Sequence, residues 1–487
     1  MGRASPCDHH TTPHGPGDRW TRCVAGHLLG TSPYMAHGAK NGGSRPRIVI
    51  VGGGYVGLNT ALRLESRLRH SEASVVVIDQ QPHMTYQPFL PEVAAASVEP
   101  RHVIAPLRSM LRRCEVITGR VGGIDHHRRT VTVTDGDGAT EEVDYDILAV
   151  APGSISRILP IPGLVEQGIG FKTVSEAIYL RNHVLSRLDA AASATDTARR
   201  RRLLTFLTVG GGYAGIEALA EMEDMSRLAT RDYPAIDPAE LRWVLVEATD
   251  RIMPEVSRPM GEYTVDLLRE RGIEVHLETT VSSMEDGHVV LGDGTEFDTD
   301  TVIWTAGVRP DPMLGDTTLP LDQRGRVRCT ATLQVAGVPG VFAAGDCAAV
   351  PDLTRIDEDP DATCGPSAQH AARQAHRLGD NIVATIRGHR PAEYRHAYIG
   401  SVAGLGLYQG VAEIYGVRLK GLPAWLVHRA YHLAKMPSVN RKVRIAFDWL
   451  LAALFRREAV AIGSLQDPHS EFRRAADAAG RWQRSHV

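Results

Sequence analysis

The apolar residues of the chain recur in two similar series of segments, and each series predicts the same α/β unit. In each, a run rich in β-branched and aromatic residues enters a glycine-rich loop and a helical pattern follows, over residues 47–69 and again over 203–228. A second short apolar run then ends on an acidic residue, at 75–79 and at 242–247. Such strands, alternating with helices, are typical of parallel sheets covered by helices. We therefore expect two related Rossmann-like domains.

Later segments repeat this correspondence. At residues 130–153, a hairpin pattern is followed by a strand that ends in a turn of small residues. The same order of hairpin, strand and small-residue turn recurs at 288–307. Helical patterns are expected at 176–192 and 367–382, whereas 86–101 is too rich in proline for a single helix. The second half of the chain therefore resembles the first in fold.

Both glycine-rich loops follow the pattern G-x-G-x-x-G between a strand and a helix. This arrangement lets the backbone approach a dinucleotide pyrophosphate, and the helix N-terminus directs its free N–H groups at the anion. One such motif is weak by itself because glycines are common in ordinary turns, but two in the same context indicate two dinucleotide sites. The residues concerned are Gly52, Gly54, Tyr55 and Gly57 in the first loop, and Gly210, Gly212 and Gly215 in the second.

An acidic residue closes the second strand of each series. Asp79 has the spacing of the carboxylate that accepts hydrogen bonds from an adenosine ribose, although it could simply end a strand. Glu247 lies further from its loop because a turn-rich insertion is expected at 233–240, after a polar, basic approach to the strand at 193–202. A carboxylate at Glu247 would hold a ribose diol and repel a 2′-phosphate, which favours NADH over NADPH.

Other candidate residues stand where backbone can approach a ligand. Gly153 and Gly307 belong to small-residue turns at strand ends, and Asp346 ends the short apolar run 341–347, where it could bond a ribityl hydroxyl or merely form a turn. Glu217 lies just inside the second loop's helix, either as a partner of the helix dipole or near a nicotinamide. Alanines at helical spacing after Ala368 permit close packing against a ring system, and Gln369 supplies a polar group there.

Composition limits the class of protein. A chain of 487 residues should form two or three domains. The net charge of −3 gives no basic field for nucleic acid. Apolar runs fall short of the roughly 18 uncharged residues of a membrane-spanning helix. The six cysteines lack C-x-x-C and C-x4-C spacing, so neither a disulfide framework nor a metal site is expected and a reducing cytosolic compartment is the default.

Residues 1–44 and the tail 464–487 are expected to be disordered or flexible.

The C-terminal region differs from the rest. After a strand-like stretch at 397–416, helical patterns at 422–434 and 443–455 each place apolar residues on one face. Seven cations accompany them and predict a basic rim: Arg429, Lys435, Arg441, Lys442, Arg444, Arg456 and Arg457. Such helices suit a membrane interface. A docked C-terminal domain or a dimer face is the alternative.

The order of these motifs resembles one family. The ordered set GGGYVG, Asp79, YQPFLPEVAAAS, AVAPGS, VGGGYAGIE, WTAGV, VFAAGDC and SAQHAARQ is similar to that of the type II NADH:quinone oxidoreductases, single-subunit enzymes of the two-dinucleotide-binding flavoprotein superfamily. The resemblance covers about residues 47–460. Two positions depart from the family pattern: Arg373 stands where a second glutamine is frequent, and Pro152 where threonine is.

The resemblance implies a role for each candidate. FAD would be bound by Gly52, Gly54, Gly57, Asp79 and Asp346, and NADH by Gly210, Gly212, Gly215 and Glu247. Ala368, Gln369 and Ala371 would line the quinone tunnel, and Glu217 would lie beside the nicotinamide. Glu217 and Gln369 are the candidate catalytic residues, which orient the nicotinamide and the quinone and relay protons. The C-terminal helices would anchor the protein peripherally on the cytoplasmic side of the membrane.

The expected domains follow from this assignment. Residues 45–165 and 310–395 form the FAD domain, 166–309 the inserted NADH domain, and 396–463 the membrane-anchoring region. The expected reaction carries two electrons from NADH through FAD to menaquinone or ubiquinone without proton pumping, and a homodimer is possible.

Two alternatives remain at this point. A sulfide:quinone oxidoreductase would need two cysteines beside the flavin, and Cys347 and Cys364 are near enough in sequence to be considered. That chemistry has no use for a second dinucleotide site, and the region that directly follows Gly153 contains no cysteine, where such enzymes usually carry one. A redox sensor that binds FAD and NADH without turnover is the other alternative.

Overall fold

The computed structural model describes residues 45–396, 399–455, 457, 460–461 and 473. The segments predicted to be disordered or flexible, 1–44 and 464–487, lie outside the described residues except for Arg473. Within the described part, two parallel five-stranded sheets dominate the fold. The α/β prediction is confirmed.

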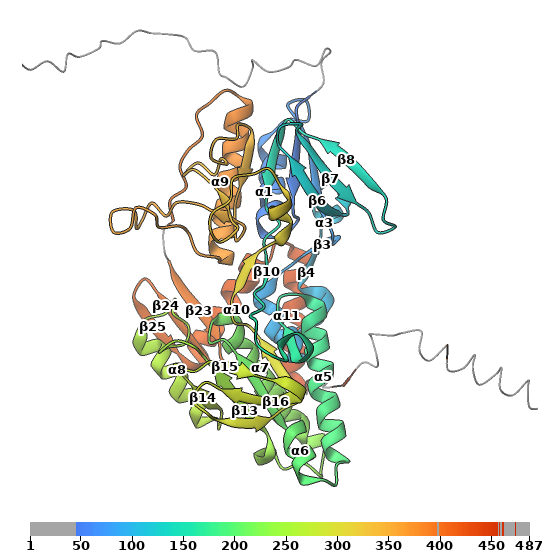
Figure 1. Ribbon diagram of the computed structural model, residues 1–487, viewed down its shortest axis with the longest axis vertical. Helices are drawn as coiled ribbons and strands as arrows, with labels where there is room; N and C mark the ends of the chain where they lie inside the picture. The colour runs from blue at the N-terminus through green and yellow to red at the C-terminus, as the bar shows by residue number, and fades with distance from the viewer. Residues whose placement is uncertain (1–44, 397–398, 456, 458–459, 462–472, 474–487) are drawn as a thin grey trace, which may run out of the picture. The chain divides into compact units, whose positions relative to one another are not determined.

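The first sheet has the strand order β21-β9-β1-β2-β5 and is parallel throughout. Its strands are β1 (Arg47–Val51), β2 (Ser74–Asp79), β5 (Glu115–Thr118), β9 (Ile147–Val150) and β21 (Val341–Ala343). Helix α1 (Tyr55–Arg67) packs beside α9 (Ala368–Ile386), as Figure 1 shows, and Arg63 joins Asp380 across their contact at 2.9 Å. A late segment of the chain thus completes the sheet that the first segment begins.

The second sheet has the order β11-β18-β12-β13-β14 and repeats four strands of the first; its outer strand β11 precedes the other strands in the chain, whereas β21 follows them in the first sheet. Its strands are β11 (Gly168–Gly170), β12 (Thr205–Val209), β13 (Arg242–Val246), β14 (Glu274–His276) and β18 (Thr301–Trp304). It is also parallel throughout, and its helices include α5 (Val174–Ala192), α7 (Tyr213–Ala229) and α8 (Arg258–Glu270). The sequence correspondence between the two units is therefore a structural repeat.

Each parallel sheet is accompanied by an antiparallel sheet of three strands. These are β6-β7-β8 in the first unit (Arg120–Asp125, Thr130–Thr134, Thr140–Asp144) and β15-β16-β17 in the second (Val281–Ser283, His288–Leu291, Glu296–Asp298). The expected hairpins are thus present in both units, each followed by the strand that ends in the small-residue turn.

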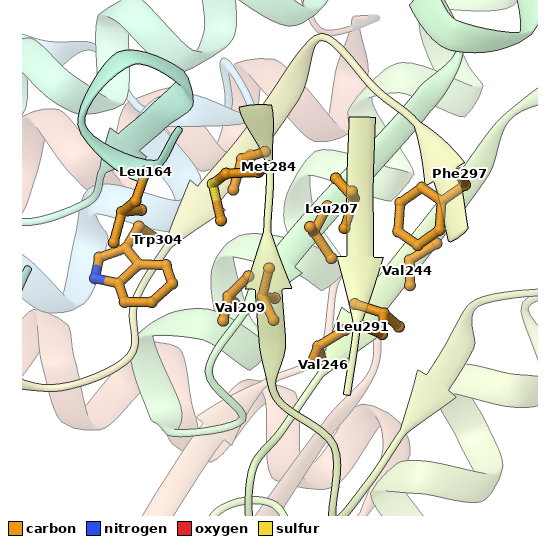
Figure 2. Packing of buried hydrophobic residues seen from close by; sticks show 12 residues of the cluster. Leu164, Leu207, Val209, Val244, Val246, Met284, Leu291, Phe297 and Trp304 are labelled. Atoms are coloured by element: carbon orange, nitrogen blue, oxygen red, sulfur yellow. The ribbon is translucent and has the colours of Figure 1, made fainter. Parts of the chain in front are cut away.

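Figure 2 shows the core that joins the second antiparallel sheet to the parallel one. Leu207 and Val209 of β12 lie in one buried cluster with Leu291 of β16, Phe297 of β17 and Trp304 at the end of β18. Full burial of each such side chain stabilises the fold by roughly 1.5–3 kcal/mol. This packing fixes the C-terminal ends of β12 and β18, from which the glycine loop and the Gly307 turn emerge.

Short elements connect these layers. The proline-rich residues 86–101 form η2 (Gln87–Phe89) and α2 (Leu90–Ala94), with η3 (Pro100–His102) at their end. The remaining short elements are β3 (His83–Thr85), β4 (Ile104–Pro106), α3 (Leu107–Met110), β10 (Ser154–Ser156), α4 (Leu164–Gln167), η4 (Thr230–Asp232), η5 (Pro238–Glu240), η6 (Glu285–Gly287), β19 (Val308–Pro310), η7 (Pro312–Asp316), β20 (Val327–Arg328) and β22 (Ala348–Ala349).

One segment differs from expectation. The polar stretch 193–202 is not a simple approach to a strand, because it contains most of α6 (Thr197–Leu203). The Asp196 side chain caps this helix by accepting hydrogen bonds from the N–H groups of Ala198 and Arg199. Residues 199–202 are four consecutive arginines, so they show no apolar periodicity from which this short helix could be predicted.

The C-terminal region forms a three-stranded antiparallel sheet and two helices: β23 (Gly400–Gly404), β24 (Gly410–Ile414), β25 (Val417–Lys420), α10 (Gly421–Lys435) and α11 (Val439–Leu454). Helix α10 packs on β23 and β24. Helix α11 is attached to the 92–102 segment, because Asp448 lies 2.6 Å from His102 Nδ1 and Trp449 donates to Glu92 at 2.8 Å. Among the described residues, no helix combines the length and apolarity needed to cross a membrane.

Candidate active site

The first glycine loop is tightly folded and held by Asp79. The backbone N–H of Gly53 donates to Asp79 Oδ2 at 2.5 Å. Gly52 has a φ of +96°, and a Cβ there would lie 2.1 Å from the Ala151 carbonyl oxygen; a Cβ on Gly57 would lie 1.7 Å from that of Gly52. Above Gly54, by contrast, a Cβ would meet nothing within 4 Å. The loop therefore excludes side chains on its packed side and is open where a pyrophosphate would approach.

The second loop has the same construction. The N–H of Gly211 donates to Glu247 Oε2 at 2.6 Å, and Glu247 Oε1 accepts from Thr249. A Cβ on Gly215 would lie 2.0 Å from the Gly210 carbonyl oxygen, whereas one on Gly212 would meet nothing within 4 Å. Each carboxylate keeps lone pairs beyond these bonds, so both sites fit a dinucleotide with its ribose at the strand end.

The two small-residue turns are brought together by a link between the units. Gly153 and Gly307 both have positive φ, 78° and 93°, and the strands that leave them, β10 and β19, pair antiparallel. The Gly307 carbonyl also accepts from Arg157 N at 3.1 Å. The turns that end β9 and β18 therefore belong to one connection between the two parallel sheets.

Asp346 belongs to a polar group that sequence reasoning did not assemble. Ser154 Oγ donates to Asp346 Oδ2 at 2.6 Å, and Lys172 Nζ donates to Ser154 Oγ at 2.8 Å. Burial lowers the pKa of Lys172, and the Asp346 and Glu176 carboxylates oppose that shift. The sequence position of Ser154 directly after Gly153 could have indicated a place in this site. We find no such indication for Lys172, which lies just after the end of β11.

Gln369 and Glu217 are attached to opposite ends of one strand. Gln369, next to Ala368 at the start of α9, donates from Nε2 to Gly400 O at 3.1 Å. Glu217 accepts a hydrogen bond from Gly404 N at 2.9 Å. These are the end residues of β23, so at the usual rise of about 3.3 Å per residue the two attachment points are about 13 Å apart. The structure brings both residues to one strand without bringing them into contact.

Glu217 is buried among groups from the C-terminal region. His428 Nε2 of α10 lies 3.0 Å from Glu217 Oε1. Burial raises the pKa of Glu217 to about 7, although His432 and the Gly404 N–H favour its ionised form. The first turn of α7 contains no acidic residue, so the interpretation of Glu217 as a first-turn partner of the helix dipole is wrong.

The cysteines at the first site are buried thiols. Cys347 Sγ lies 3.3 Å from Ala344 O, and burial raises its pKa to about 12. Burial likewise raises the pKa of Cys364 to about 12. Both are free cysteines, and a thiol must ionise to act as a nucleophile. Burial therefore disfavours the thiolate form that sulfide chemistry would use at both cysteines.

The amphipathic character expected of the C-terminal helices is present. Leu422 and Leu426 of α10 are exposed, as are Val443, Phe447, Leu450, Leu451 and Leu454 of α11. The basic rim needs correction, however. Arg429 is buried and lies 3.4 Å from Glu92. The side chain of Arg457 is also buried and lies 3.2 Å from Glu221, so each arginine neutralises a carboxylate in the interior. Arg456 is outside the described residues.

Known proteins match the chain over most of its length. The family profile described as "Pyridine nucleotide-disulphide oxidoreductase" matches residues 46–375. A type II NADH:quinone oxidoreductase, Ndh of Mycobacterium tuberculosis, is 28% identical over 85% of this chain and 89% of its own length. The demethylphylloquinone reductase NdbB of Synechocystis is 30% identical over 84% of this chain and 97% of its own length.

Solved structures agree in fold. NDH2 from Plasmodium falciparum, determined in complex with NADH, superposes with a TM-score of 0.79 and 17% identity over 86% of this chain and 100% of that chain. The reduced CoADR-RHD of Bacillus anthracis reaches a TM-score of 0.61 at 21% identity over 76% of this chain and 61% of that chain. At these identities the likeness establishes the fold alone. With the family profile and the curated relatives, the chain belongs to the pyridine nucleotide-disulphide oxidoreductase family, and within it to the type II NADH:quinone oxidoreductases.

Proposed function

We propose that the chain is an FAD-dependent NADH:quinone oxidoreductase that carries two electrons from NADH to a membrane quinone and pumps no protons. The observation that carries this proposal is the paired loop construction, in which Asp79 and Glu247 each bond the backbone of their own glycine loop. Two such loops suit a resident dinucleotide and a second, exchanging one. The curated relatives are named for this activity or for reduction of a related quinone.

We assign FAD to residues 45–165 and 310–395, and NADH to the inserted residues 166–309. The pairing of β21 with β9 supports the discontinuous assignment, since residues 341–343 complete the sheet that begins at β1. Likewise β11 completes the second sheet from the start of the inserted segment. The C-terminal residues 396–463 then form the third region.

The residues fit their ligands as follows. The FAD pyrophosphate would be held by the first loop, which comprises Gly52, Gly54, Tyr55 and Gly57. Asp79 would bind the ribose and Asp346 the ribityl chain, and Gly153 would allow the backbone to approach the cofactor closely. The second loop, Gly210, Gly212 and Gly215, would hold the NADH pyrophosphate, with Glu247 on the ribose and Gly307 beside it. FAD, when bound, supplies the two-electron redox chemistry.

The protein's own contribution is positioning, exclusion of water and proton handling. Ser154 and Lys172 fix the Asp346 carboxylate, so that it presents a set direction to a hydroxyl group. Glu217 would orient the nicotinamide, and Gln369 beside Ala368 would orient the quinone, as both are held by the backbone of β23. Menaquinone or ubiquinone is the expected acceptor.

The exposed apolar residues of α10 and α11 support a peripheral membrane site, on the cytoplasmic side, through which a lipid-soluble quinone would enter. Phe447 and Leu454 expose 59% and 67% of their surface, and exposed apolar side chains gathered on one face are typical of a surface that binds a partner or a membrane. A homodimer through this face is the alternative use of the same surface.

One experiment tests donor and acceptor together. NADH is added anaerobically to the purified yellow protein, and menaquinone or ubiquinone analogues follow. We expect the yellow colour to bleach with NADH and to recover when the quinone is added. NADH oxidation that a soluble quinone does not accelerate would overturn the proposal and leave the sensor alternative.

A further inference from the structure

Lys172 brings a positive charge from the proposed NADH domain to the proposed FAD site. It follows β11, whereas Ser154 begins β10 and Asp346 lies shortly after β21, both in the proposed FAD domain. Lys172 Nζ donates to Ser154 Oγ at 2.8 Å, and Ser154 Oγ donates to Asp346 Oδ2 at 2.6 Å. One hydroxyl group therefore separates the ammonium from the carboxylate that we assign to the ribityl chain.

The ammonium group of Lys172 has donors left for a ligand. An ammonium carries three N–H donors. Within the described residues, the bond to Ser154 is the hydrogen bond that Lys172 Nζ makes. The carboxylate of Glu176 is engaged elsewhere, because its Oε2 accepts from the backbone N–H groups of Lys172 and Thr173 in the capping box of α5. Two donors of a half-buried cation thus remain beside the FAD site.

The backbone of Lys172 is fixed on both sides. Its N–H donates to Glu176 at 2.8 Å, and its carbonyl oxygen accepts from Gln87 Nε2 at 3.2 Å. The preceding residue, Phe171, is buried in the core. These contacts limit the volume that the Nζ atom can reach, so the charge has a defined place relative to Ser154.

The residue type at position 172 is also informative. Between residues 45 and 419, Lys172 is the one lysine of the sequence, and the other strongly basic side chains there are arginines. Lysine differs from arginine because its ammonium is a compact point charge. Burial lowers the pKa of Lys172, whereas the carboxylates of Asp346 and Glu176 favour its charged form. The site therefore holds a cation where burial alone would disfavour one.

Reduction of the bound cofactor changes the charge beside Asp346. A hydride, which is two electrons and one proton, passes from NADH to FAD, so NAD⁺ is released and the reduced cofactor carries one more negative charge. Repulsion by the Asp346 carboxylate disfavours that charge, and a nearby cation offsets the repulsion. His370 also faces Asp346, but burial lowers its pKa and so favours the neutral ring. Lys172 is the charged group that remains.

We propose that Lys172 sets the reduction potential of the bound FAD. Its ammonium holds Ser154 and Asp346 in place and offsets the charge of the carboxylate, so the reduced cofactor is bound more tightly than it would be beside Asp346 alone. Lys172 is thus a positioning residue that the NADH domain supplies to the FAD domain. This inference rests on the proposed function, because it requires FAD at the first glycine loop.

The test measures the reduction potential of FAD in the holoenzyme by anaerobic equilibration with a reference dye. In Lys172→Met, the equilibrium constant for reduction should fall about tenfold, which corresponds to a potential about 30 mV lower for a two-electron couple. Lys172→Arg keeps the positive charge and should stay within about threefold of wild type. An equal fall in both variants would show that charge is not the cause and would overturn the inference.

A matched control and a second neutral variant accompany this measurement. Lys420 is exposed and lies over the Tyr263 ring at 3.9 Å, so Lys420→Met should keep the wild-type potential. Lys172→Gln should show the same fall as Lys172→Met. If both neutral variants lose FAD, Lys172→Arg decides the question. Retained FAD at a potential near that of wild type supports the inference, and lost FAD or a lowered potential overturns it.

Failure of this inference differs from failure of the proposed function. A Lys172→Met protein that keeps FAD at the wild-type potential overturns the inference, while NADH oxidation by quinone stands. If NADH does not bleach the wild-type protein, or if quinone does not restore its colour, the proposed function fails.

Discussion

Asp79 Oδ2 accepts a hydrogen bond from the N–H of Gly53 at 2.5 Å, so the residue that would bind the ribose also fixes the loop that would bind the pyrophosphate. Asp79 also accepts from Gln81 N at 2.7 Å, and burial raises its pKa against the effect of both bonds. One side chain therefore couples two parts of the expected FAD site.

From this coupling we predict that Asp79→Ala purifies with little FAD. A hydrogen bond to a charged group contributes about 1.5–3 kcal/mol, so FAD affinity should fall roughly 10- to 150-fold. The ratio of flavin absorbance to protein absorbance measures the occupancy. Asp137→Asn, in the exposed turn between β7 and β8, is the control and should retain full flavin. Full occupancy in Asp79→Ala would contradict the assignment.

The second loop gives a prediction about cofactor choice. Glu247 holds Gly211 N and Thr249, and its carboxylate would repel a 2′-phosphate. In Glu247→Gln the amide oxygen can still accept the Gly211 bond while the charge is lost. We expect the preference for NADH over NADPH, measured as the ratio of kcat/KM values, to fall about tenfold, which corresponds to about 1.4 kcal/mol. Glu285→Gln, an exposed change, should leave the ratio unaltered.

The loops and their carboxylates could be predicted from sequence because the information is local. A strand, its loop and its helix are contiguous, and Asp79 and Glu247 each follow at the end of the next strand. The strand that follows the longer connection at residues 233–240 could also be predicted, since its apolar pattern resumes at Arg242, where β13 begins.

The rest depends on contacts between distant segments. The helical pattern predicts Arg429 on a basic rim beside the apolar face, but Arg429 turns inward to Glu92, more than 300 residues earlier, which lies 3.4 Å away. Lys172 and Ser154 join Asp346 only once β11 and β9 are placed in their sheets. A helical pattern shows which residues share a face, but not which carboxylate lies opposite.

Glu217 should make stability depend on pH in a defined direction. Its pKa is about 7 in the folded protein against an ordinary value of 4.5, so the folded state keeps a proton that the unfolded state releases between these values. Stability from this group is therefore fully present below pH 4.5 and is lost as pH rises to about 7. Glu217→Gln, which resembles the protonated acid, should match wild type near pH 4.5 and exceed it at pH 8 by about 3 kcal/mol.

Thermal unfolding at both pH values measures this difference. The histidines do not confuse it, because the lowered pKa values of His428 and His432 cost stability as pH falls below 6.5 in wild type and variant alike. A variant whose unfolding temperature runs parallel to that of wild type from pH 4.5 to 8 would show that Glu217 is not a neutral buried acid.

The exposed face of α11 gives the last prediction. Phe447→Asp places a charge in the middle of the proposed lipid-binding surface, where the native ring is 59% exposed and free to be buried by a bilayer. Burial of a phenylalanine contributes roughly 1.5–3 kcal/mol, so the fraction bound to anionic phospholipid vesicles should fall at least about tenfold in a sedimentation assay. The unfolding temperature should change little, because the side chain leaves the packed interior untouched. Val165→Asp, at a 76% exposed position on α4, is the matched control and should bind vesicles as wild type does. If Phe447→Asp binds vesicles normally but shifts the mass measured by light scattering from dimer to monomer, the face is an interface between two copies of the chain and the membrane proposal is wrong.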